Sequence, residues 1–190
     1  MISNKVNWVL IKKKLCVERD EAGIAKRTKM FNAFDGNGNG YLSLAELDRG
    51  IRDVLNCQEV FQVKAVIMRA YQAAKNMGRT RSKHSEDYVE RNEFRVFLVY
   101  LRQYFEYWEM FELIDVDHDR KVSITEFKHA IPKMEKWGVK VSDPETAFKE
   151  VDENGGGSVL FEEFCHWAIK KHFDLEDDDD FEDTLLSKMK

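Results

Sequence analysis

Residues 35–46, which read DGNGNGYLSLAE, place oxygen-bearing groups at the spacing of a twelve-residue calcium loop. Calcium in such a loop takes its oxygen ligands from positions 1, 3, 5, 7 and 12, at about 2.3–2.6 Å. These positions hold Asp35, Asn37, Asn39, Tyr41 (through its backbone carbonyl) and Glu46. Gly40 stands at position 6, where the chain must turn with a positive φ. The segment therefore predicts a calcium site, with Ser43 at position 9 supplying a water-bridged contact.

Two other interpretations of this segment are weaker. A glycine-rich surface turn gives no reason for Asp and Asn to alternate with Gly and then lead to an apolar residue and a terminal Glu. A phosphate-binding loop would follow a strand and end in Lys-Ser or Lys-Thr, and this segment does neither.

The same pattern recurs at residues 115–126 and 152–163, which we call the third and fourth loops because an incomplete second copy precedes them. The ligands predicted in the third loop are Asp115, Asp117, Asp119, the carbonyl of Lys121, and Glu126. Those predicted in the fourth loop are Asp152, Asn154, the carbonyl of Ser158, and Glu163. Each loop lies between apolar helical patterns, so each predicts a hand, that is, a helix–loop–helix unit.

The helices that must position these loops are predicted from apolar residues at helical spacing. Around the first loop these residues are Met30, Phe31 and Phe34, then Leu44, Leu47, Ile51 and Val54. Around the third loop they are Trp108, Phe111 and Ile114, then Phe127, Ala130, Ile131 and Met134.

The second hand is degenerate. Residues 88–94 copy the back half of the first loop, but counting back from Glu93 puts Ser82 at position 1 and His84 at position 3, and neither is a good calcium ligand. Ten more residues separate this hand from the first than separate the fourth hand from the third, and we place them in the basic segment 75–87. We expect the second loop to bind no metal but to contribute a short strand that pairs Val89 with Leu42. Val122 and Val159 should pair in the same way.

The three complete loops differ in their expected affinity for calcium. The third has four carboxylates at positions 1, 3, 5 and 12, although Arg120 occupies the position that calls for Gly, at a cost on the order of 1 kcal/mol. The first has two carboxylates and two amides, whereas the fourth lacks a side-chain ligand at Gly156 and Leu160. We rank them third, first, fourth, and expect calcium in the third to help order the fourth.

These patterns predict an all-α fold of four hands arranged as two lobes in a chain of 190 residues, 43% of them apolar. The predicted segments are a basic and apolar N-terminal segment (1–19), a lobe of hands 1 and 2 (20–101), a lobe of hands 3 and 4 (102–173) and an acidic tail (174–190). Residues 94–114 contain neither Gly nor Pro and should form one helix. Its aromatic stripe predicts a core between lobes that pack together, the alternative being a groove for a target helix.

The two ends of the chain carry opposite charge. Residues 1–20 have a net charge of +3 and contain the run Trp8–Ile11 before three lysines, which fits either an anionic membrane surface or a short helix docked on the first lobe. Eight acidic residues lie in 174–183, and without them the formal net charge would change from −5 to +3. We expect the tail to be solvated, with a basic partner or the basic insertion (Arg79, Arg81, Lys83) as alternatives.

Several function classes are disfavoured. No aromatic-laced basic surface supports nucleic-acid binding, and no run reaches the length of a membrane span. The five histidines form no HExxH or triad-like set, so we expect no enzymatic activity. Three widely spaced cysteines, Cys16, Cys57 and Cys165, indicate a reducing compartment, with Cys57 and Cys165 as buried thiols.

Two segments, residues 127–145 and 85–95, resemble the flagellar calcium-binding proteins (calflagins) of kinetoplastids. The resemblance covers about residues 20–170 and includes the enlarged second hand. It implies four EF-hands, calcium sensing, and residence in the cilium or flagellum, otherwise in the cytoplasm. It also implies that calcium binds mainly to the two C-terminal hands. Members of the family reach the flagellar membrane through an acylated N-terminus, but Ile2 stands here where myristoylation needs Gly. A soluble or axoneme-associated relative is therefore an equal expectation.

Three functions follow as hypotheses: a calcium sensor acting on a protein target in the axoneme or at the flagellar membrane, a structural axonemal component or calcium buffer, and, weakest, a metal-dependent enzyme.

Overall fold

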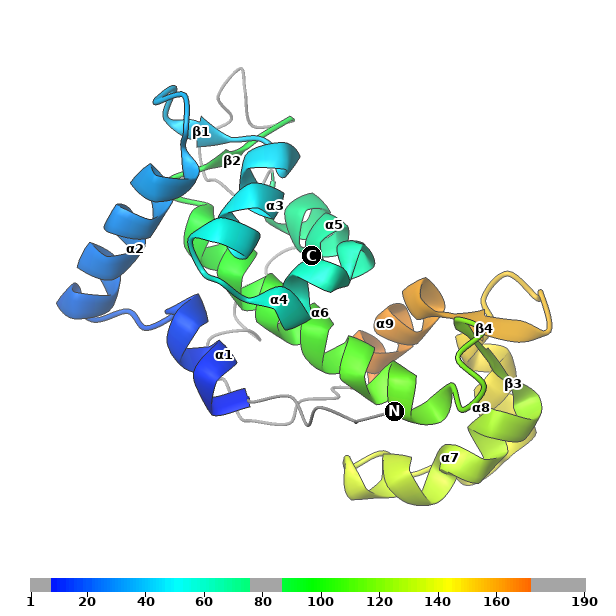
Figure 1. Ribbon diagram of the computed structural model, residues 1–190. Helices are drawn as coiled ribbons and strands as arrows, with labels where there is room; N and C mark the ends of the chain where they lie inside the picture. The colour runs from blue at the N-terminus through cyan, green and yellow to red at the C-terminus, as the bar shows by residue number, and fades with distance from the viewer. Residues whose placement is uncertain (1–7, 76–86, 172–190) are drawn as a thin grey trace, which may run out of the picture. The chain divides into compact units, whose positions relative to one another are not determined.

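The computed structural model describes residues 8–75 and 87–171, and most of the regular structure in these ranges is helical (Figure 1). The helices are α1 (Trp8–Leu15), α2 (Glu21–Phe34), α3 (Leu44–Asp53), α4 (Gln58–Gln62), α5 (Lys64–Ala74), α6 (Phe94–Ile114), α7 (Ile124–Lys136), α8 (Pro144–Val151) and α9 (Phe161–Lys170). The short strands are β1 (Tyr41–Leu42), β2 (Val89–Glu90), β3 (Lys121–Ser123) and β4 (Ser158–Leu160). The predicted all-α class is confirmed.

The chain divides into two compact units, residues 1–106 and 107–190. In the first, hand 1 is formed by α2 and α3, and hand 2 by α5 and the start of α6. In the second, hand 3 is formed by the end of α6 and α7, and hand 4 by α8 and α9. Helix α6 spans 94–114, the range that the absence of Gly and Pro predicts.

The aromatic residues before the first loop form the core of the first unit. Phe31 and Phe34 pack edge-on against Phe94, with ring centroids 5.4 and 5.3 Å away. Helix α3 approaches this core closely through Gly50, where an added Cβ would collide with the ring of Phe34. Val54, predicted on the apolar face of this helix, is 43% exposed because α3 ends at Asp53. That assignment is wrong.

The second unit has its own aromatic core. Phe111 lies 5.6 Å from Phe161 and 5.8 Å from Phe164, measured between ring centroids. Phe127 packs in the same way against Phe148 and Trp167. The helix ends that flank the loops are therefore held by aromatic contacts within this unit.

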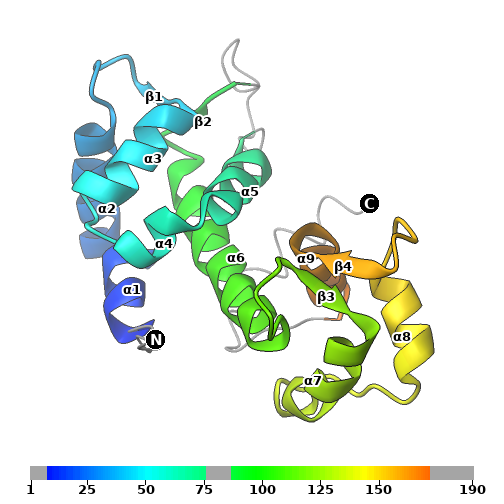
Figure 2. The same ribbon diagram turned by 45° about the vertical axis from the view of Figure 1, so that its right-hand side comes forward.

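Each pair of hands is joined by a two-stranded antiparallel sheet (Figure 2). Leu42 pairs with Val89 in one sheet, and Val122 pairs with Val159 in the other. Both predicted pairs are confirmed, and all four side chains are buried. The buried valines and leucine hold each loop against its neighbour.

The N-terminal helix α1 docks on the first unit. Ile11, Leu15 and Cys16 are buried, and Lys26 donates a hydrogen bond to the carbonyl of Lys13 at 2.9 Å. This is the docked-helix alternative for the N-terminal segment. Cys57 and Cys165 are also buried, as predicted, and both are free thiols.

Pro144 occupies the first turn of α8, with Asp143 as the N-cap. Among the described residues, no helix is both long and apolar enough to cross a membrane. The acidic tail, the basic insertion at Arg79, Arg81 and Lys83, the degenerate ligand positions Ser82 and His84, and residues 1–7 lie outside the described residues.

Candidate metal centres

The backbone turns in the same way in all three complete loops. Two positions in each loop, 4 and 6, have a positive φ. These values are +71° at Gly38 and +87° at Gly40, +59° at His118 and +68° at Arg120, and +67° at Gly155 and +77° at Gly157. The turn at position 6 is predicted from the motif, whereas the turn at position 4 was missed. Its only sequence signal is Gly at position 4 in two of the three loops.

The acidic side chain at position 1 gathers the loop backbone around itself. Asp115 accepts hydrogen bonds from the backbone N–H of Asp119 at 3.2 Å and of Arg120 at 2.9 Å. Asp35 and Asp152 accept the same two bonds from positions 5 and 6 of their own loops, at 2.8–3.1 Å. These carboxylates therefore lie inside the turn.

The side chains at positions 3 and 5 fold back along the loop. Asn37 and Asp117 each accept a hydrogen bond from the N–H two residues further on, at 2.9 and 3.2 Å. Asn39 and Asp119 do the same towards Tyr41 and Lys121, at 3.1 and 2.8 Å. Such turns hold each oxygen close to the loop's own backbone. Tyr41, Lys121 and Ser158, the predicted carbonyl ligands, are the first residues of β1, β3 and β4.

The Glu at position 12 closes each loop from the first turn of the following helix. Its carboxylate accepts a hydrogen bond from the N–H at position 9 in all four hands. The donor–acceptor pairs are Ser43–Glu46 at 3.1 Å, Glu90–Glu93 at 2.9 Å, Ser123–Glu126 at 2.9 Å and Leu160–Glu163 at 2.8 Å. In the third and fourth loops the same carboxylate also reaches back to the start of the loop, to the N–H of Val116 (2.9 Å) and Asn154 (3.1 Å).

Ser43 and Ser123 have a second role that sequence reasoning missed. Each side chain is the N-cap of the helix that follows, accepting from the N–H of Glu46 or Glu126 at 3.3 Å. Each hydroxyl also donates to the carboxylate of that Glu, at 2.8 and 2.7 Å. The signal was present, because Ser followed by Glu three residues later is a capping box. Leu160 in the fourth loop offers no such side chain.

The third loop brings acidic groups closest together. Ligand atoms of Asp115, Asp117 and Glu126 all lie within 4.8 Å of one another. Asp119 accepts a hydrogen bond from the backbone N–H of Lys121 and is not part of this group. The first and fourth loops each contribute only two of the predicted carboxylates, so this triad is the strongest concentration of negative charge among the predicted ligands.

Burial and hydrogen bonding act in opposite directions on two of these acids. Burial raises the pKa of Asp115 above its ordinary value, with the charges of Asp119 and Glu126 adding to the effect. Burial also opposes ionisation of Glu126, but the hydrogen bonds donated by Ser123 and Val116 outweigh it and lower the pKa. Asp115 is 0% exposed. A buried acid beside other carboxylates needs a compensating cation, and a hard dication such as Ca²⁺ prefers oxygen donors. The residues of the third loop therefore fit calcium.

The second hand retains only the closing half of this arrangement. Glu93 is 1% exposed, and β2 contributes its strand to the sheet with β1. The prediction that this hand binds no metal stays a prediction, because the positions that would hold its first ligands lie outside the described residues.

In hands 1 and 4, side chains from the helix that follows the loop lie close to position 2, which sequence reasoning also missed. In hand 1, the guanidinium of Arg49 sits against Gly36 so closely that a Cβ there would collide with it. In hand 4, His166 Nδ1 lies 3.3 Å from the carboxylate of Glu153, which also accepts from Lys170 at 2.7 Å. His118, by contrast, is 68% exposed, and its Nδ1 lies 3.5 Å from the carboxylate of Glu112.

Comparison with known proteins extends this description. Residues 11–101 match the family model described as the FCaBP EF-hand domain, and residues 107–169 match an EF-hand domain pair. The chain is 38% identical over 175 residues to the flagellar calcium-binding protein of Trypanosoma cruzi, covering 91% of this chain and 83% of that protein. It is 35% identical over 182 residues to flagellar calcium-binding protein TB-24 of Trypanosoma brucei brucei, covering 95% and 84%. A further relative, TB-1.7G of the same organism, is 35% identical over 182 residues, covering 95% and 80%.

Proposed function

Because this chain belongs to the family of flagellar calcium-binding EF-hand proteins, we propose that it is a calcium sensor that acts on a protein target in the flagellum. It binds Ca²⁺ through its hands, as the family does. The sensing role, the target and the flagellar location are our proposal, and the geometry of the third loop carries it.

The third loop ties two helices to one ion site. Asp115 is the residue that follows α6, and its N–H donates to the carbonyl of Phe111 at 2.9 Å. Glu126 lies in the first turn of α7. A cation held between these two carboxylates would pull the end of α6 and the start of α7 towards each other. Ion binding is thereby linked to the angle between the helices.

The helices that would move carry the aromatic core of the second unit. Phe111 from α6 packs on Phe161 and Phe164 from α9, and Phe127 from α7 packs on Phe148 and Trp167. A change in the angle between α6 and α7 would expose part of this surface. An apolar groove between hands is a recognised docking site for an amphipathic target helix.

The proposal is tested by an apolar fluorescent dye and a calcium titration of the whole chain. We expect stronger dye fluorescence with calcium than with chelator. Most of this difference should be lost in Glu126→Gln, which removes one negative charge from the acidic cluster of the third loop. Glu135→Gln, an exposed change on the same helix, is the matched control and should behave like the parent protein. Equal dye binding with and without calcium would end the sensor proposal.

A structural role is the second candidate, and one observation favours it. Hand 2 keeps its strand and its buried Glu93, although no metal ligands are predicted at its first positions. This hand therefore favours a structural role. A structural component would keep its fold and its partner binding in Glu126→Gln combined with Glu46→Gln. A sensor would lose calcium-dependent partner binding in the same variant.

The flagellar part of the proposal is supported by the names of the relatives. Localisation of the untagged chain in a flagellated cell tests it. Extraction with detergent then separates the two expected locations, because a membrane-bound protein is released and an axonemal one remains with the microtubules.

A further inference from the structure

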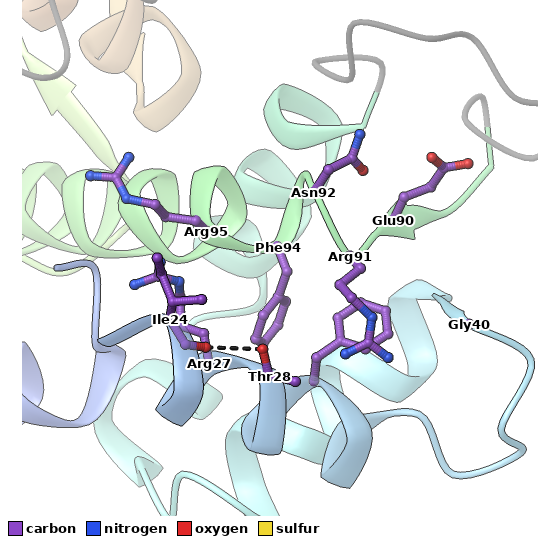
Figure 3. Close-up of a pocket in the computed structure, with 10 residues that line it drawn as sticks. Ile24, Arg27, Thr28, Gly40, Glu90, Arg91, Asn92, Phe94 and Arg95 are labelled. Atoms are coloured by element: carbon purple, nitrogen blue, oxygen red, sulfur yellow. Dashed lines mark hydrogen bonds between the residues drawn. The ribbon is translucent and has the colours of Figure 1, made fainter. Parts of the chain in front are cut away.

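We propose that the first unit contains a binding site for an acidic peptide segment of a protein partner, in an arginine-lined cavity beside the first loop. The inference deepens the proposed function, because it names the chemistry of the partner. The cavity has a volume of about 730 Å³, within the usual range of ligand sites, and lies between α2 and the residues that lead into α6 (Figure 3).

Three arginines line this cavity: Arg27 from α2, Arg91 from the turn after β2, and Arg95 from α6. Among the lining residues that the structure describes, the only carboxylate is that of Glu90. The lining therefore has an excess of positive charge, which is complementary to carboxylates.

Two of the arginines are fixed by the backbone that joins α1 to α2. Arg27 donates through Nη1 to the carbonyls of Cys16 and Glu18, and Arg95 donates through Nε to the carbonyl of Val17 at 2.7 Å. The bonds of Arg27 use a single one of its nitrogens. A guanidinium carries five N–H donors, so Arg27 is held in place while retaining donors for a ligand.

The third arginine is held by an aromatic ring. The guanidinium carbon of Arg91 lies 4.4 Å from the centroid of the Phe31 ring, and Nη2 donates to Asn32 Oδ1 at 2.7 Å. Nη2 carries two N–H groups and this bond uses one of them, so one edge of the guanidinium keeps both of its donors. Guanidinium forks bind carboxylates through two parallel hydrogen bonds, an arrangement that a lysine cannot provide.

The apolar part of the lining favours a peptide over a phosphorylated small molecule or a lipid head group. Ile24, one of the lining residues, is 51% exposed, whereas Phe31 and Phe94, which also line the cavity, are buried. The carboxylate of Glu90 would repel a dense cluster of phosphate charge. A segment in which Glu or Asp alternates with apolar side chains satisfies both the arginines and Ile24.

The test measures fluorescence anisotropy of a short labelled peptide of alternating Glu and Leu, mixed with the whole chain in calcium. A peptide with Gln in place of Glu is the ligand control. We expect saturable binding of the Glu peptide that weakens as salt is raised, and little binding of the Gln peptide. Arg91→Gln should weaken binding by about tenfold, equivalent to about 1.4 kcal/mol, because it removes a charge-assisted hydrogen-bonding group.

Two further variants keep the test decisive. Arg52→Gln removes the same group from α3, outside the cavity, and should leave binding unchanged. Arg91→Lys keeps the charge but not the fork and should fall between the parent and Arg91→Gln. Circular dichroism confirms that each variant is folded.

Equal binding of both peptides, equal loss in Arg52→Gln and Arg91→Gln, or binding to vesicles of anionic lipid without binding to the Glu peptide would each overturn the inference. Its failure is distinguishable from failure of the sensor proposal, because the dye test reports on α6 and α7 and does not involve Arg91.

Discussion

Glu126 Oε1 accepts a hydrogen bond of 2.9 Å from the backbone N–H of Val116, which connects the last residue of the third loop to its second. The other oxygen of the same carboxylate accepts from the N–H and the hydroxyl of Ser123. One side chain thus organises both ends of the loop. Its position is fixed from the helix side, so the loop backbone is shaped by the same group that is predicted to ligate the ion.

Arg120 should affect stability and calcium affinity through two separable properties. Its φ of +68° costs a non-glycine residue on the order of 1 kcal/mol, and its positive charge opposes a cation. Arg120→Gly should therefore raise the free energy of unfolding by about 1 kcal/mol, and it should also strengthen calcium binding.

The control for this prediction is Arg120→Ala, which removes the charge but keeps the strained φ. Calorimetry should show the same gain in calcium affinity for both variants, whereas only the Gly variant should gain stability in chelator. Identical stability of the two would show that the backbone at position 6 is not strained.

Asp115→Asn should stabilise the calcium-free protein while weakening its response to calcium. An acid whose pKa is raised by folding contributes stability in its protonated form, which is present below the ordinary pKa of Asp and is lost as pH rises through the raised value. At neutral pH the charged, buried Asp115 therefore works against folding. The neutral amide removes that penalty but also removes a ligand charge.

The measurement is the thermal midpoint in chelator and in calcium across a range of pH. In chelator we expect Asp115→Asn to exceed the parent protein at neutral pH and to lose this advantage in acid. Asp117→Asn, an exposed member of the same acidic group, should give a smaller gain. A parent protein more stable than Asp115→Asn in chelator at neutral pH would contradict the argument.

Ser123→Ala should destabilise the second unit by about 1 kcal/mol, because the N-cap of α7 is lost. It should also weaken calcium binding, since the hydroxyl helps to orient Glu126. Denaturant unfolding in chelator and calorimetry with calcium measure the two effects.

The converse change, Leu160→Ser, introduces a capping side chain into the fourth loop and should stabilise it. No effect from either change would mean that these caps are not significant for the hands.

Gly50→Ala should destabilise the first unit although it raises helix propensity. Ala is favoured over Gly in a helix by about 1 kcal/mol, but its Cβ would collide with the ring of Phe34, and overpacking of this kind costs about 1–3 kcal/mol. We expect a net loss of stability in denaturant unfolding. Adding Phe34→Leu, which makes room, should reduce the penalty of Gly50→Ala, and strict additivity of the two changes would rule out the collision.

The elements of the fold follow well from the sequence where the signal is a count along the chain. A twelve-residue loop with an apolar residue at position 8 fixes which residues meet, so the pairs Leu42–Val89 and Val122–Val159 were predictable. The extent of α6 was predictable in the same way, from an uninterrupted run without Gly or Pro.

The features that were missed depend on contacts between distant segments or on backbone angles without a residue signature. His118 has a positive φ, which its residue type alone does not predict. Arg27 is separated from Arg91 and Arg95 by more than sixty residues in the sequence, and only the packing of α2 beside the start of α6 brings Arg27 and Arg95 to one place. The EF-hand units can thus be read from the sequence, whereas the grouping of these arginines cannot.

The register of β3 and β4 places position 7 of each loop opposite position 9 of the other, with Lys121 across from Leu160 and Ser123 across from Ser158. The two ions of this unit would therefore be connected by one hydrogen-bonded ladder. Coupling between two binding sites is reciprocal, so if the ion in one loop strengthens binding in the other, the second ion strengthens binding of the first by the same free energy. A substitution that weakens calcium binding in the fourth loop would consequently also lower the calcium affinity of the third. Evolution could thus change the affinity of the stronger site through substitutions in the weaker one alone.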